Sequence, residues 1–367
     1  MKRILFFINT LDTGGAERVL VDLVSKLPKD QYEVTVQTLC GGSFCDQLPD
    51  HVSHQQIIKV KNPSLSGFLR KLFSKLPGLT GRLMKNNYDI EVAYLEGFPT
   101  KVIAARTTKS KKIAFVHTNV AQADIISTKY PSKTACLEQY RLFDRVCFVS
   151  NQALEGFLQV IGRLKQGQVI HNVIDFDRVR RFAQEPLSSV YTTKGKKLIA
   201  VGRLIALKGF DRLIRICAKL EQKFDFELLI LGDGDQHAAL EETLIKTGCK
   251  SVHLAGMQKN PYPWMQQADL LICSSFSEGY STTIVEALAL GLPVITTACA
   301  GMDEILEGGK WGKITELSDE SLELGLREIL ENPDVYYDLK HRSMMRKEQL
   351  TDEASVAEYR QLFDSFA

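Results

Sequence analysis

The chain has 367 residues, about twice the size of a common domain, so two domains are expected, each large enough to bury its own core. Hydrophobic content of 44% and charged content of 25% are ordinary for a soluble protein, and no stretch approaches the roughly 20 apolar residues of a membrane span. Residues 1–185 carry 26 Lys+Arg against 17 Asp+Glu, a net +9, whereas residues 186–367 carry 20 against 27, a net −7. This asymmetry predicts that the N-terminal half meets an anionic partner.

The cysteines and the N-terminus indicate a cytoplasmic protein. Eight cysteines are scattered along the chain without a CxxC pair, so neither a zinc site nor a redox motif is supported. Lys2 and Arg3 precede an apolar run of only five residues, which is too short for the core of a signal peptide. That run, Ile4–Ile8, is expected to be a buried first strand.

The N-terminal half alternates strand and helix patterns. Ile4–Ile8, a glycine loop, the amphipathic segment Ala16–Leu27 and the strand Glu33–Leu39 predict a βαβ unit of the kind that builds parallel sheets. Further strands are expected at Ile90–Ala93, Lys112–Val116, Arg145–Val149 and Gln168–His171. We place the end of this first domain at residue 172.

One basic stretch departs from this alternation. From His51 to Tyr88 there is no Asp or Glu but seven Lys and Arg. Within it, apolar residues recur at helical spacing, at Leu65, Phe68, Leu69, Leu72, Phe73 and Leu76. A basic amphipathic helix at about residues 64–85 suits the surface of an anionic membrane. The alternative is that its apolar stripe packs on the domain core while the cations face solvent.

The C-terminal half repeats the opening pattern. Residues 177–195 are polar and patternless and predict a linker flanked by a short helix. The strand Lys197–Val201, a loop and the helix Phe210–Leu220 then follow. Later strands are expected at Glu227–Leu231, Ser251–Leu254, Leu270–Cys273 and Val294–Thr297. Two successive parallel α/β domains are therefore predicted, with a ligand site in the cleft that they share.

A glycine-containing loop follows the first strand of each predicted domain. Gly14 and Gly15 precede a helix, where glycine lets the backbone approach a ligand closely. The motif is neither GxGxxG nor a P-loop, so no dinucleotide site follows. In the second domain, Arg203 and Lys208 share one loop at the carboxyl end of a strand, which suits a diphosphate clamp. Two exposed surface charges are the alternative.

The strongest candidate site is residues 276–294. A buried strand leads through Glu278 into a helix whose first N–H groups lack internal partners and attract anions. Glu278 and Glu286 suit acid/base catalysis if both reach one substrate. Glu286 has a second interpretation, because Thr283 to Glu286 also fits a capping box that closes the helix start.

A histidine completes the candidate set. His117 directly follows the strand Lys112–Val116, at the carboxyl edge of the first predicted sheet. A histidine at such an edge can donate to a substrate oxygen near neutral pH, although a hydrogen-bonded loop residue is the commoner outcome. His171 is the weaker candidate because it ends a strand at the domain junction.

With these residues in view, the sequence resembles the family 4 glycosyltransferases, retaining GT-B enzymes that use nucleotide sugars. The resemblance covers essentially the whole chain and rests above all on Glu278 and Glu286, which match the family's E-x7-E signature. The other matching motifs are Gly14 to Glu17, Val149-Ser150, His171 to Asp175, Gly202-Arg203 with Lys208-Gly209, Gly232 to Gly234 and Gly291 to Val294. The chain departs from the family pattern at Tyr280-Ser281 and at Asn172-Val173.

The resemblance implies an α/β fold of two Rossmann-like parallel-sheet domains facing a central cleft. Residues 1–172 plus about 352–367 would form the acceptor-side domain, because the final helix, Ala354–Phe366, usually returns to the first domain in this fold. Residues 173–351 would bind the nucleotide sugar. Members need no divalent metal, and the chain has no DxD motif at a plausible site, so no metal or other cofactor is expected.

The resemblance also implies roles for the matching residues. Arg203 and Lys208 would hold the donor diphosphate, helped by backbone N–H groups. Glu286 would accept from the ribose hydroxyls, while Glu278 and His117 would contact and orient the transferred sugar. The remaining donor-binding positions implied by the family are Gly14, Gly15, Met257, Gly279, Tyr280, Ser281 and Thr282.

The expected function is the transfer of a sugar, a hexose or N-acetylhexosamine, from a nucleoside diphosphate sugar, with UDP favoured. The acceptor would be a saccharide, preferably on a polyprenyl lipid at the inner face of the cell membrane, in surface polysaccharide or glycolipid synthesis. Another GT-B enzyme, an epimerase or hydrolase, and a non-catalytic nucleotide-sugar-binding protein are the alternatives. Nucleic acid is not an expected partner, because aromatic residues are not interleaved with the basic ones.

Overall fold

The computed structural model describes residues 1–12, 14–59, 69, 72–73, 75–84, 87–122, 126–188 and 191–366. The chain folds into two compact units, the first comprising Met1–Asp175 with Asp352–Ala367 and the second Phe176–Thr351. Among the described residues, no helix is both long and apolar enough to span a lipid bilayer. Each unit is built around its own parallel sheet, and the two are described in turn.

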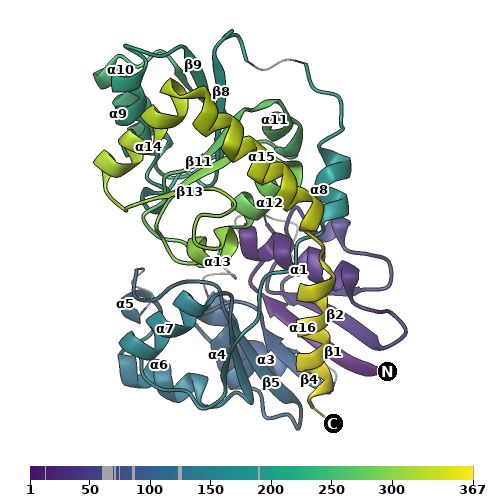
Figure 1. Ribbon diagram of the computed structural model, residues 1–367. Helices are drawn as coiled ribbons and strands as arrows, with labels where there is room; N and C mark the ends of the chain where they lie inside the picture. Colours follow the sequence, from purple (N-terminus) through teal and green to yellow (C-terminus); the bar gives the residue numbers. More distant parts are fainter. Residues whose placement is uncertain are drawn as a thin grey trace. The chain divides into compact units, whose positions relative to one another are not determined.

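The described strands of the first unit form one seven-stranded parallel sheet in the order β3-β2-β1-β4-β5-β6-β7 (Figure 1). Their bounds are β1 Lys2–Ile8, β2 Tyr32–Thr38, β3 Ser53–Gln56, β4 Ile90–Ala93, β5 Lys111–Val116, β6 Arg145–Phe148 and β7 Gly167–Val169. The opening βαβ prediction is confirmed, because α1 (Gly15–Lys26) links β1 to its parallel neighbour β2. A continuous apolar run suits β1, since a central parallel strand is covered on both faces.

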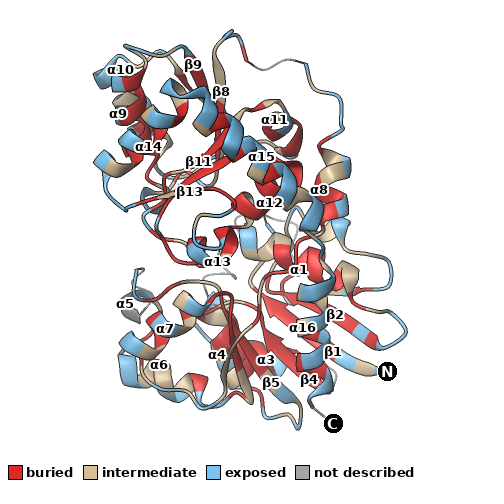
Figure 2. Ribbon diagram, viewed as in Figure 1, coloured by how far each residue is buried: buried red, intermediate tan, exposed pale blue. Residues whose placement is uncertain are grey.

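Helices cover both faces of this sheet, and side chains alternate between two cores. Phe6 of β1 packs into one core and Phe7 into the other. Figure 2 shows the central strands β1 and β4 mostly as buried, whereas the edge strand β3 is exposed or half-buried. The described helices are α1, α3 Pro77–Leu83, α4 Phe98–Ala104, α5 Ile126–Lys129, α6 Lys133–Tyr140, α7 Asn151–Val160, the 3-10 turn η1 Cys45–Gln47, and α16 Glu353–Asp364.

Helix α16 belongs to the core of the first unit although it comes last in the chain. Tyr359 stacks on Phe115 of β5 with ring centroids 5.4 Å apart, and Phe363 meets Phe6 edge-on at 6.0 Å. Tyr359 and Phe363 are fully buried. Aromatic pairs of this geometry contribute about 0.5–1.5 kcal/mol each beyond the apolar area that they bury. The hydrophobic core on one face of the first sheet is therefore completed by a helix from beyond residue 351.

Lys26 of α1 pairs with two aspartates, one at each place where the chain crosses between the units: Asp175, the last residue before the second unit, and Asp352, the first residue after it. Lys26 Nζ lies 3.1 Å from Asp175 Oδ1 and 2.7 Å from Asp352 Oδ2. Asp175 also donates its backbone N–H to the buried carboxylate of Asp22, at 3.1 Å. Burial alone would lower the pKa of Lys26, but the two carboxylates outweigh it and raise that pKa. Both crossings are thus fixed to a single helix.

The second unit has a six-stranded parallel sheet, in the order β10-β9-β8-β11-β12-β13, among its described residues (Figure 1). The strands are β8 Lys196–Val201, β9 Phe226–Leu231, β10 Val252–Gly256, β11 Leu270–Cys273, β12 Val294–Thr297 and β13 Lys313–Thr315. The helices are α8 Phe176–Phe182, α9 Phe210–Leu220, α10 His237–Thr247, α11 Tyr262–Gln267, α12 Thr282–Leu290, α13 Met302–Leu306, α14 Asp319–Glu331 and α15 Pro333–Gln349, with the 3-10 turn η2 Ala206–Lys208. Strand β8 is central, so its carboxyl end and that of β11 are adjacent.

The structure adds two edge strands that the sequence does not predict. These are β3 and β13, and the reason is that Ser53–Gln56 is wholly polar and Lys313–Thr315 is only three residues long. Helix α8 is the short helix expected to flank the linker, and it forms because Phe176 and Val179 bury one side of it. The basic helix expected at residues 64–85 lies largely outside the described residues.

Candidate active site

The candidate site of the second unit is built where β11 gives way to α12. Strand β11 is apolar and mostly buried, and the chain then runs through residues 274–281 before α12 begins at Thr282. The helix ends at Gly291, whose φ of 74° is the left-handed conformation that glycine adopts at helix ends. The loop carrying Glu278 therefore lies at the carboxyl edge of the parallel sheet, where α/β proteins bind ligands.

Lys208 and Glu278 are in direct contact. Lys208 Nζ lies 2.6 Å from Glu278 Oε1, and the Ser275 hydroxyl donates to the same oxygen at 2.6 Å. Burial opposes the charge of Lys208, but the Glu278 carboxylate outweighs it and raises the pKa of the ammonium. Both side chains keep partial exposure, 22% for Lys208 and 12% for Glu278, so a ligand can reach them.

A small hollow adjoins this pair and is also lined by Ser275, Ser281 and Cys273. A larger pocket lies elsewhere in the second unit, beside Gly309 and Arg342. None of the expected site residues lines the larger one. Only the smaller hollow is lined by expected site residues, namely Lys208, Glu278 and Ser281, so the lining residues and not the size identify the site.

Arg203 is exposed, and its side chain makes no ion pair or hydrogen bond within the described residues. It follows β8 at a point where two glycine loops touch, because a Cβ on Gly232 would lie 1.9 Å from Gly202 O. Leu204 N–H donates to Asp233 O at 3.0 Å, which ties the two loops together. The fold thus holds the backbone at Arg203 while leaving its guanidinium available to a ligand.

Glu286 takes part in a buried polar chain and does not close a capping box. Because Ser281 is the N-cap of α12, the capping position three residues on is Ile284, so the capping interpretation is wrong. Glu286 instead accepts a hydrogen bond from the Tyr262 hydroxyl at 2.9 Å, and Arg178 Nη1 donates to that hydroxyl at 3.0 Å. This carboxylate is 8% exposed.

The start of α12 offers unpaired donors. Within the described part of the chain, the backbone N–H groups of Ser281 and Thr282 donate no hydrogen bond, and the side chain of Ser281 provides no cap. Gly279 is buried, and its carbonyl oxygen packs closely against Gly301, where a Cβ would lie 2.8 Å from that oxygen. Tyr280 is half-buried. The first N–H groups of this nine-residue helix are therefore available to an anion.

Met257 follows β10 and is 51% exposed. The preceding residue, Gly256, has a φ of 69°, and its carbonyl accepts from Gly232 N–H at 2.9 Å. This hydrogen bond fixes the Met257 segment against the glycine loop beside Arg203. Among the described residues, no group of three or more His, Cys, Asp or Glu side chains is arranged to hold a metal ion.

The remaining expected site residues lie in the first unit. Gly14 is the N-cap of α1 and Gly15 its first residue; Thr13 is outside the described residues. A Cβ on Gly14 would lie 2.0 Å from Glu17 Oε2, so this glycine leaves room for a side chain of its own helix. His171, the weaker candidate, is bound by Glu358 of α16, which accepts from its backbone N–H at 3.0 Å.

His117 follows β5, as expected, and sits over a buried carboxylate. The Glu96 carboxylate accepts from the backbone N–H of His117 at 3.2 Å and from the Thr118 hydroxyl. Lys129 Nζ lies 3.8 Å from Glu96 Oε1. Burial lowers the pKa of His117 more than Glu96 raises it, so the ring is neutral at pH 7. Its Nε2 is buried and has no hydrogen-bond partner among the described residues.

Four polar residues of these sites were not singled out from the sequence. Ser275 and Tyr262 contact the two signature glutamates, and Glu96 supports His117. Arg212 is wholly buried under the Glu278 loop. Tyr262, Glu96 and Arg212 act through contacts with residues at least 21 positions away, and Ser275 lies just before the matching motif, three residues from Glu278.

The comparisons with known proteins agree with this fold of two parallel-sheet α/β units. Residues 13–178 match the family described as Glycosyltransferase Family 4, and residues 195–332 match the family described as Glycosyl transferases group 1. The chain belongs to the family 4 glycosyltransferases.

The relatives found by sequence are glycosyltransferases from several organisms. The N-acetylgalactosamine-N,N'-diacetylbacillosaminyl-diphospho-undecaprenol 4-alpha-N-acetylgalactosaminyltransferase of Campylobacter jejuni is 27% identical over 371 residues, 94% of this chain and 95% of that protein. The amylovoran biosynthesis glycosyltransferase AmsD of Erwinia amylovora is 27% identical over 84% of each chain. A glycosyltransferase of Methanocaldococcus jannaschii is 37% identical, but over only 38% of this chain and 36% of its own length.

Solved structures confirm the GT-B fold. Anabaena HepE, in complex with UDP and glucose, matches with a TM-score of 0.78 at 19% identity over 100% of both chains. The sucrose-phosphate synthase of Thermosynechococcus elongatus matches with a TM-score of 0.76 at 16% identity, again over 100% of both chains. At these identities the likeness concerns the fold, which is the one that the sequence resemblance implied.

Proposed function

We propose that this protein is a retaining glycosyltransferase that moves a sugar from a UDP-linked donor to a saccharide acceptor carried on a polyprenyl diphosphate. The observation that carries the proposal is the contact between Lys208 and Glu278 beside the unpaired N-terminus of α12. A cation, a carboxylate and free N–H groups within one loop system suit a sugar joined to a diphosphate.

The leaving group governs the chemistry. When the bond between the anomeric carbon and the diphosphate oxygen breaks, negative charge gathers on the diphosphate. Lys208 has three N–H donors, of which Glu278 takes one, and Arg203 is exposed, so both cations can neutralise that charge. These two cations and the α12 N-terminus take the place of a divalent metal in this proposal.

The transferred sugar needs its own contacts. The second carboxylate oxygen of Glu278 would accept sugar hydroxyls, and His117 keeps the role of a sugar contact that the family resemblance implies. The acceptor hydroxyl attacks the anomeric carbon from the face that the diphosphate leaves, and its proton passes to the departing phosphate oxygen. The new bond therefore keeps the configuration of the old one, which is retention.

The donor base and the acceptor class are inferred from relatives. HepE was solved with UDP, and the Campylobacter relative acts, by its name, on a saccharide joined to diphospho-undecaprenol. In this chain Glu286 would bind the ribose hydroxyls, with Tyr262 holding its carboxylate, and the backbone near Met257 would meet the base. Gly15 would contribute a backbone N–H to the diphosphate. The transferred sugar is a hexose or an N-acetylhexosamine.

We also propose that the protein binds the inner membrane face peripherally through residues 64–85. In the described part of that stretch, four leucines are 42–46% exposed: Leu79 and Leu83 on α3, and Leu72 and Leu76 before it. Lys75 and Arg82 are exposed beside them. An apolar stripe with flanking cations fits an anionic bilayer surface. Sedimentation with vesicles should increase with anionic lipid content and fall in the L79S/L83S variant, whereas binding that ignores both would remove the membrane proposal.

The enzymatic proposal is tested by a thermal-shift screen of nucleotide sugars followed by a transfer assay. The true donor should raise the melting temperature, because it binds only the native state. With a polyprenyl diphosphate saccharide present, the product should keep the donor's anomeric configuration by NMR, and transfer should survive EDTA. Donor breakdown without an added acceptor would instead indicate a hydrolase or epimerase, and an inverted product would overturn retention.

A further inference from the structure

We propose that Arg212 is a positioning residue of this transferase: its buried guanidinium fixes the loop Ser274–Glu278 so that the Glu278 carboxylate meets Lys208. This inference rests on the proposed role of Glu278. Arg212 lies on α9, outside the matching motifs, and its side chain is 0% exposed. It therefore acts on the donor site only through the backbone that it holds.

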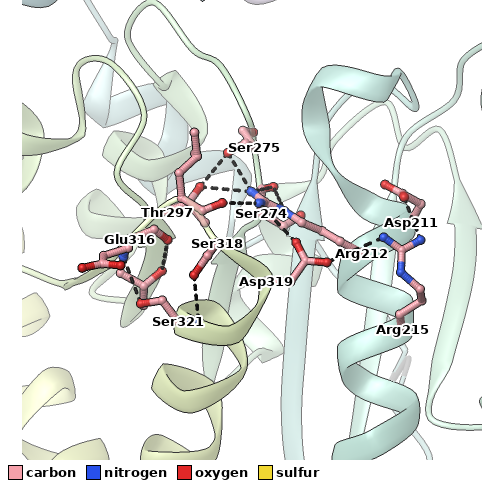
Figure 3. A network of polar contacts seen from close by, with 12 residues as sticks. Asp211, Arg212, Arg215, Ser274, Ser275, Thr297, Glu316, Ser318, Asp319 and Ser321 are labelled. Carbon is pink, nitrogen blue, oxygen red and sulfur yellow. Dashed lines mark hydrogen bonds and ion pairs between the residues drawn. The ribbon is translucent and has the colours of Figure 1, made fainter.

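The guanidinium donates to main-chain carbonyls from two different loops, as Figure 3 shows. Its Nε donates to Ser274 O at 2.9 Å, and its Nη2 donates to the same oxygen and to Ser275 O at 3.0 Å. Its Nη1 donates to Leu317 O at 2.8 Å. The planar fork of arginine, with five fixed N–H donors, matches such a set of acceptors, and a lysine ammonium does not.

Charge and packing complete the setting of this side chain. Asp319 Oδ1 lies 3.6 Å from Arg212 Nη1, so the buried cation has a carboxylate partner. The Phe276 ring lies under the guanidinium, with its centroid 3.9 Å from Cζ. A wholly buried charge persists only where such partners replace water, so this constellation specifies one loop conformation.

The held loop leads directly to the reacting site. Ser275 O accepts from Arg212 and, at 2.6 Å, from the Thr297 hydroxyl at the end of β12. The hydroxyl of the same Ser275 donates to Glu278 Oε1. Arg212 therefore fixes the main chain of Ser275, and the hydroxyl of this serine orients the Glu278 carboxylate. A displacement of about 1 Å at a reacting group can cost on the order of 10²-fold in rate.

The loop that carries Lys208 is tied to the same framework. Phe276 N–H donates to Leu207 O at 2.7 Å, and the Ser274 hydroxyl donates to Lys208 O at 2.9 Å. Gly209 has a φ of 62°, and a Cβ there would lie 2.3 Å from Ser274 O, one of the carbonyls that Arg212 binds. Arg212 is therefore placed at the junction of the two loops that supply the Lys208 and Glu278 pair.

The test is R212K, which keeps the charge but loses the planar fork. We expect kcat to fall by at least about tenfold while the UDP dissociation constant stays within about threefold, because the ribose and base would be bound by Glu286 and the Met257 segment, and Arg203 would also face the diphosphate. T297V removes a second donor to Ser275 O with little change of volume, and it should lower kcat in the same direction but less. In a double-mutant cycle with S275A, the R212K effect should shrink, since both changes act on one link.

The matched control is R215K. Arg215 lies one turn further along α9 and pairs with Asp211 at 2.9 Å and Asp319 at 3.7 Å, but it is 48% exposed and does not contact the Glu278 loop. It should leave kcat unchanged. A kcat of R212K and T297V within twofold of wild type, or equal losses in kcat and UDP affinity, would overturn the positioning role.

A readout that needs no transfer separates this inference from the proposed function. In crystals of R212K we expect the distance between Lys208 Nζ and Glu278 Oε1 to lengthen beyond hydrogen bonding, whereas R215K should keep the 2.6 Å contact. If the wild-type protein transfers no sugar, the proposed function fails, and this distance still decides the role of Arg212. An unchanged distance in R212K counts against the inference whatever the activity.

Discussion

Lys208 and Glu278 lie 70 positions apart in the chain and meet at 2.6 Å between Nζ and Oε1. The first follows the central strand β8, and the second follows its neighbour β11. Parallel pairing of these strands brings their carboxyl ends together, so the sheet itself creates the contact. Burial works against the charge of Lys208, yet Glu278 raises the pKa of the lysine, so its ammonium stays charged at neutral pH.

Removing either partner of this pair should abolish sugar transfer without unfolding the chain. We expect K208M and E278Q to lower kcat/KM by at least about 10²-fold, or about 2.7 kcal/mol of transition-state stabilisation, because each loses a charge that faces the donor. Steady-state transfer rates measure the effect, and circular dichroism confirms folding. The controls are K219M and E323Q, which break an ion pair of 2.8 Å whose lysine is 67% exposed. Full activity in K208M or E278Q contradicts the assigned chemistry.

His117 should make the protein less stable as the pH falls below 6.5. Burial lowers its pKa in the folded state, so the unfolded chain binds the proton more tightly, and stability is lost on acidification. The charged groups near the ring are Glu96 and Lys129. The pKa of Glu96 is also lowered, so protonation of this carboxylate removes further stability at more acid pH. Between pH 7 and 5, the loss of unfolding free energy in urea should be smaller for H117Q than for wild type.

The ceiling for one proton is about 1.4 kcal/mol per pH unit. His54 also has a lowered pKa and remains in H117Q, so the slope should fall without vanishing. The matched control is H237Q, because His237 is 39% exposed and faces Glu241 on a surface helix. Equal slopes for H117Q, H237Q and wild type would show that His117 does not titrate in this range.

Gly209 and Gly248 offer a matched test of close packing under the site. Both have positive φ, 62° and 65°, but a Cβ on Gly209 would strike Ser274 O at 2.3 Å, whereas nothing lies within 4 Å at Gly248. G248A should therefore cost only the left-handed penalty of about 1–2 kcal/mol. G209A should cost more and also lower kcat, because it pushes the Glu278 loop away. Urea unfolding and transfer rates distinguish the two; equal costs and unchanged kcat would contradict the packing argument.

Tyr262 should matter for nucleotide affinity through its hydroxyl. Y262F leaves Glu286 without the 2.9 Å hydrogen bond and Arg178 without an acceptor at 3.0 Å. An unmade buried hydrogen bond costs about 1–3 kcal/mol, so UDP should bind roughly tenfold more weakly by calorimetry. Y337F is the control, since Tyr337 is 64% exposed on α15. Unchanged UDP binding in Y262F would separate Glu286 from the nucleotide.

Much of the framework could be predicted because the sequence carries it locally. β11, β12 and α9 have the predicted bounds, since apolar and β-branched runs mark the two strands and apolar residues at helical spacing mark the helix. Strand β3 could not be predicted in this way, because Ser53–Gln56 pairs only at the sheet edge and needs no apolar pattern. Edge pairing depends on a neighbouring strand that the local sequence does not reveal.

The site shows the same division. Glu278 and Lys208 lie beside glycines in the segments that follow two strands, and the spacing of the signature marks Glu286 in the next helix. Arg212, in contrast, is a charged residue in an amphipathic helix and would be assigned to the solvated face. The structure buries Arg212 completely because its acceptors come from loops that are more than 60 positions away. The capping interpretation of Glu286 fails for the same reason: its partner, Tyr262, comes from another helix.

The place of α16 in the first core also affects how the protein is made. Folding during synthesis generally proceeds from the N-terminus, one domain after another. Here the sheet that is translated first lacks Tyr359 and Phe363 until nearly the whole chain has emerged, so the second unit can complete its core before the first does. A chain that stops before Glu353 would therefore still contain the whole second unit. Its first unit would lack Tyr359 and Phe363, and the apolar side chains left exposed there would favour aggregation.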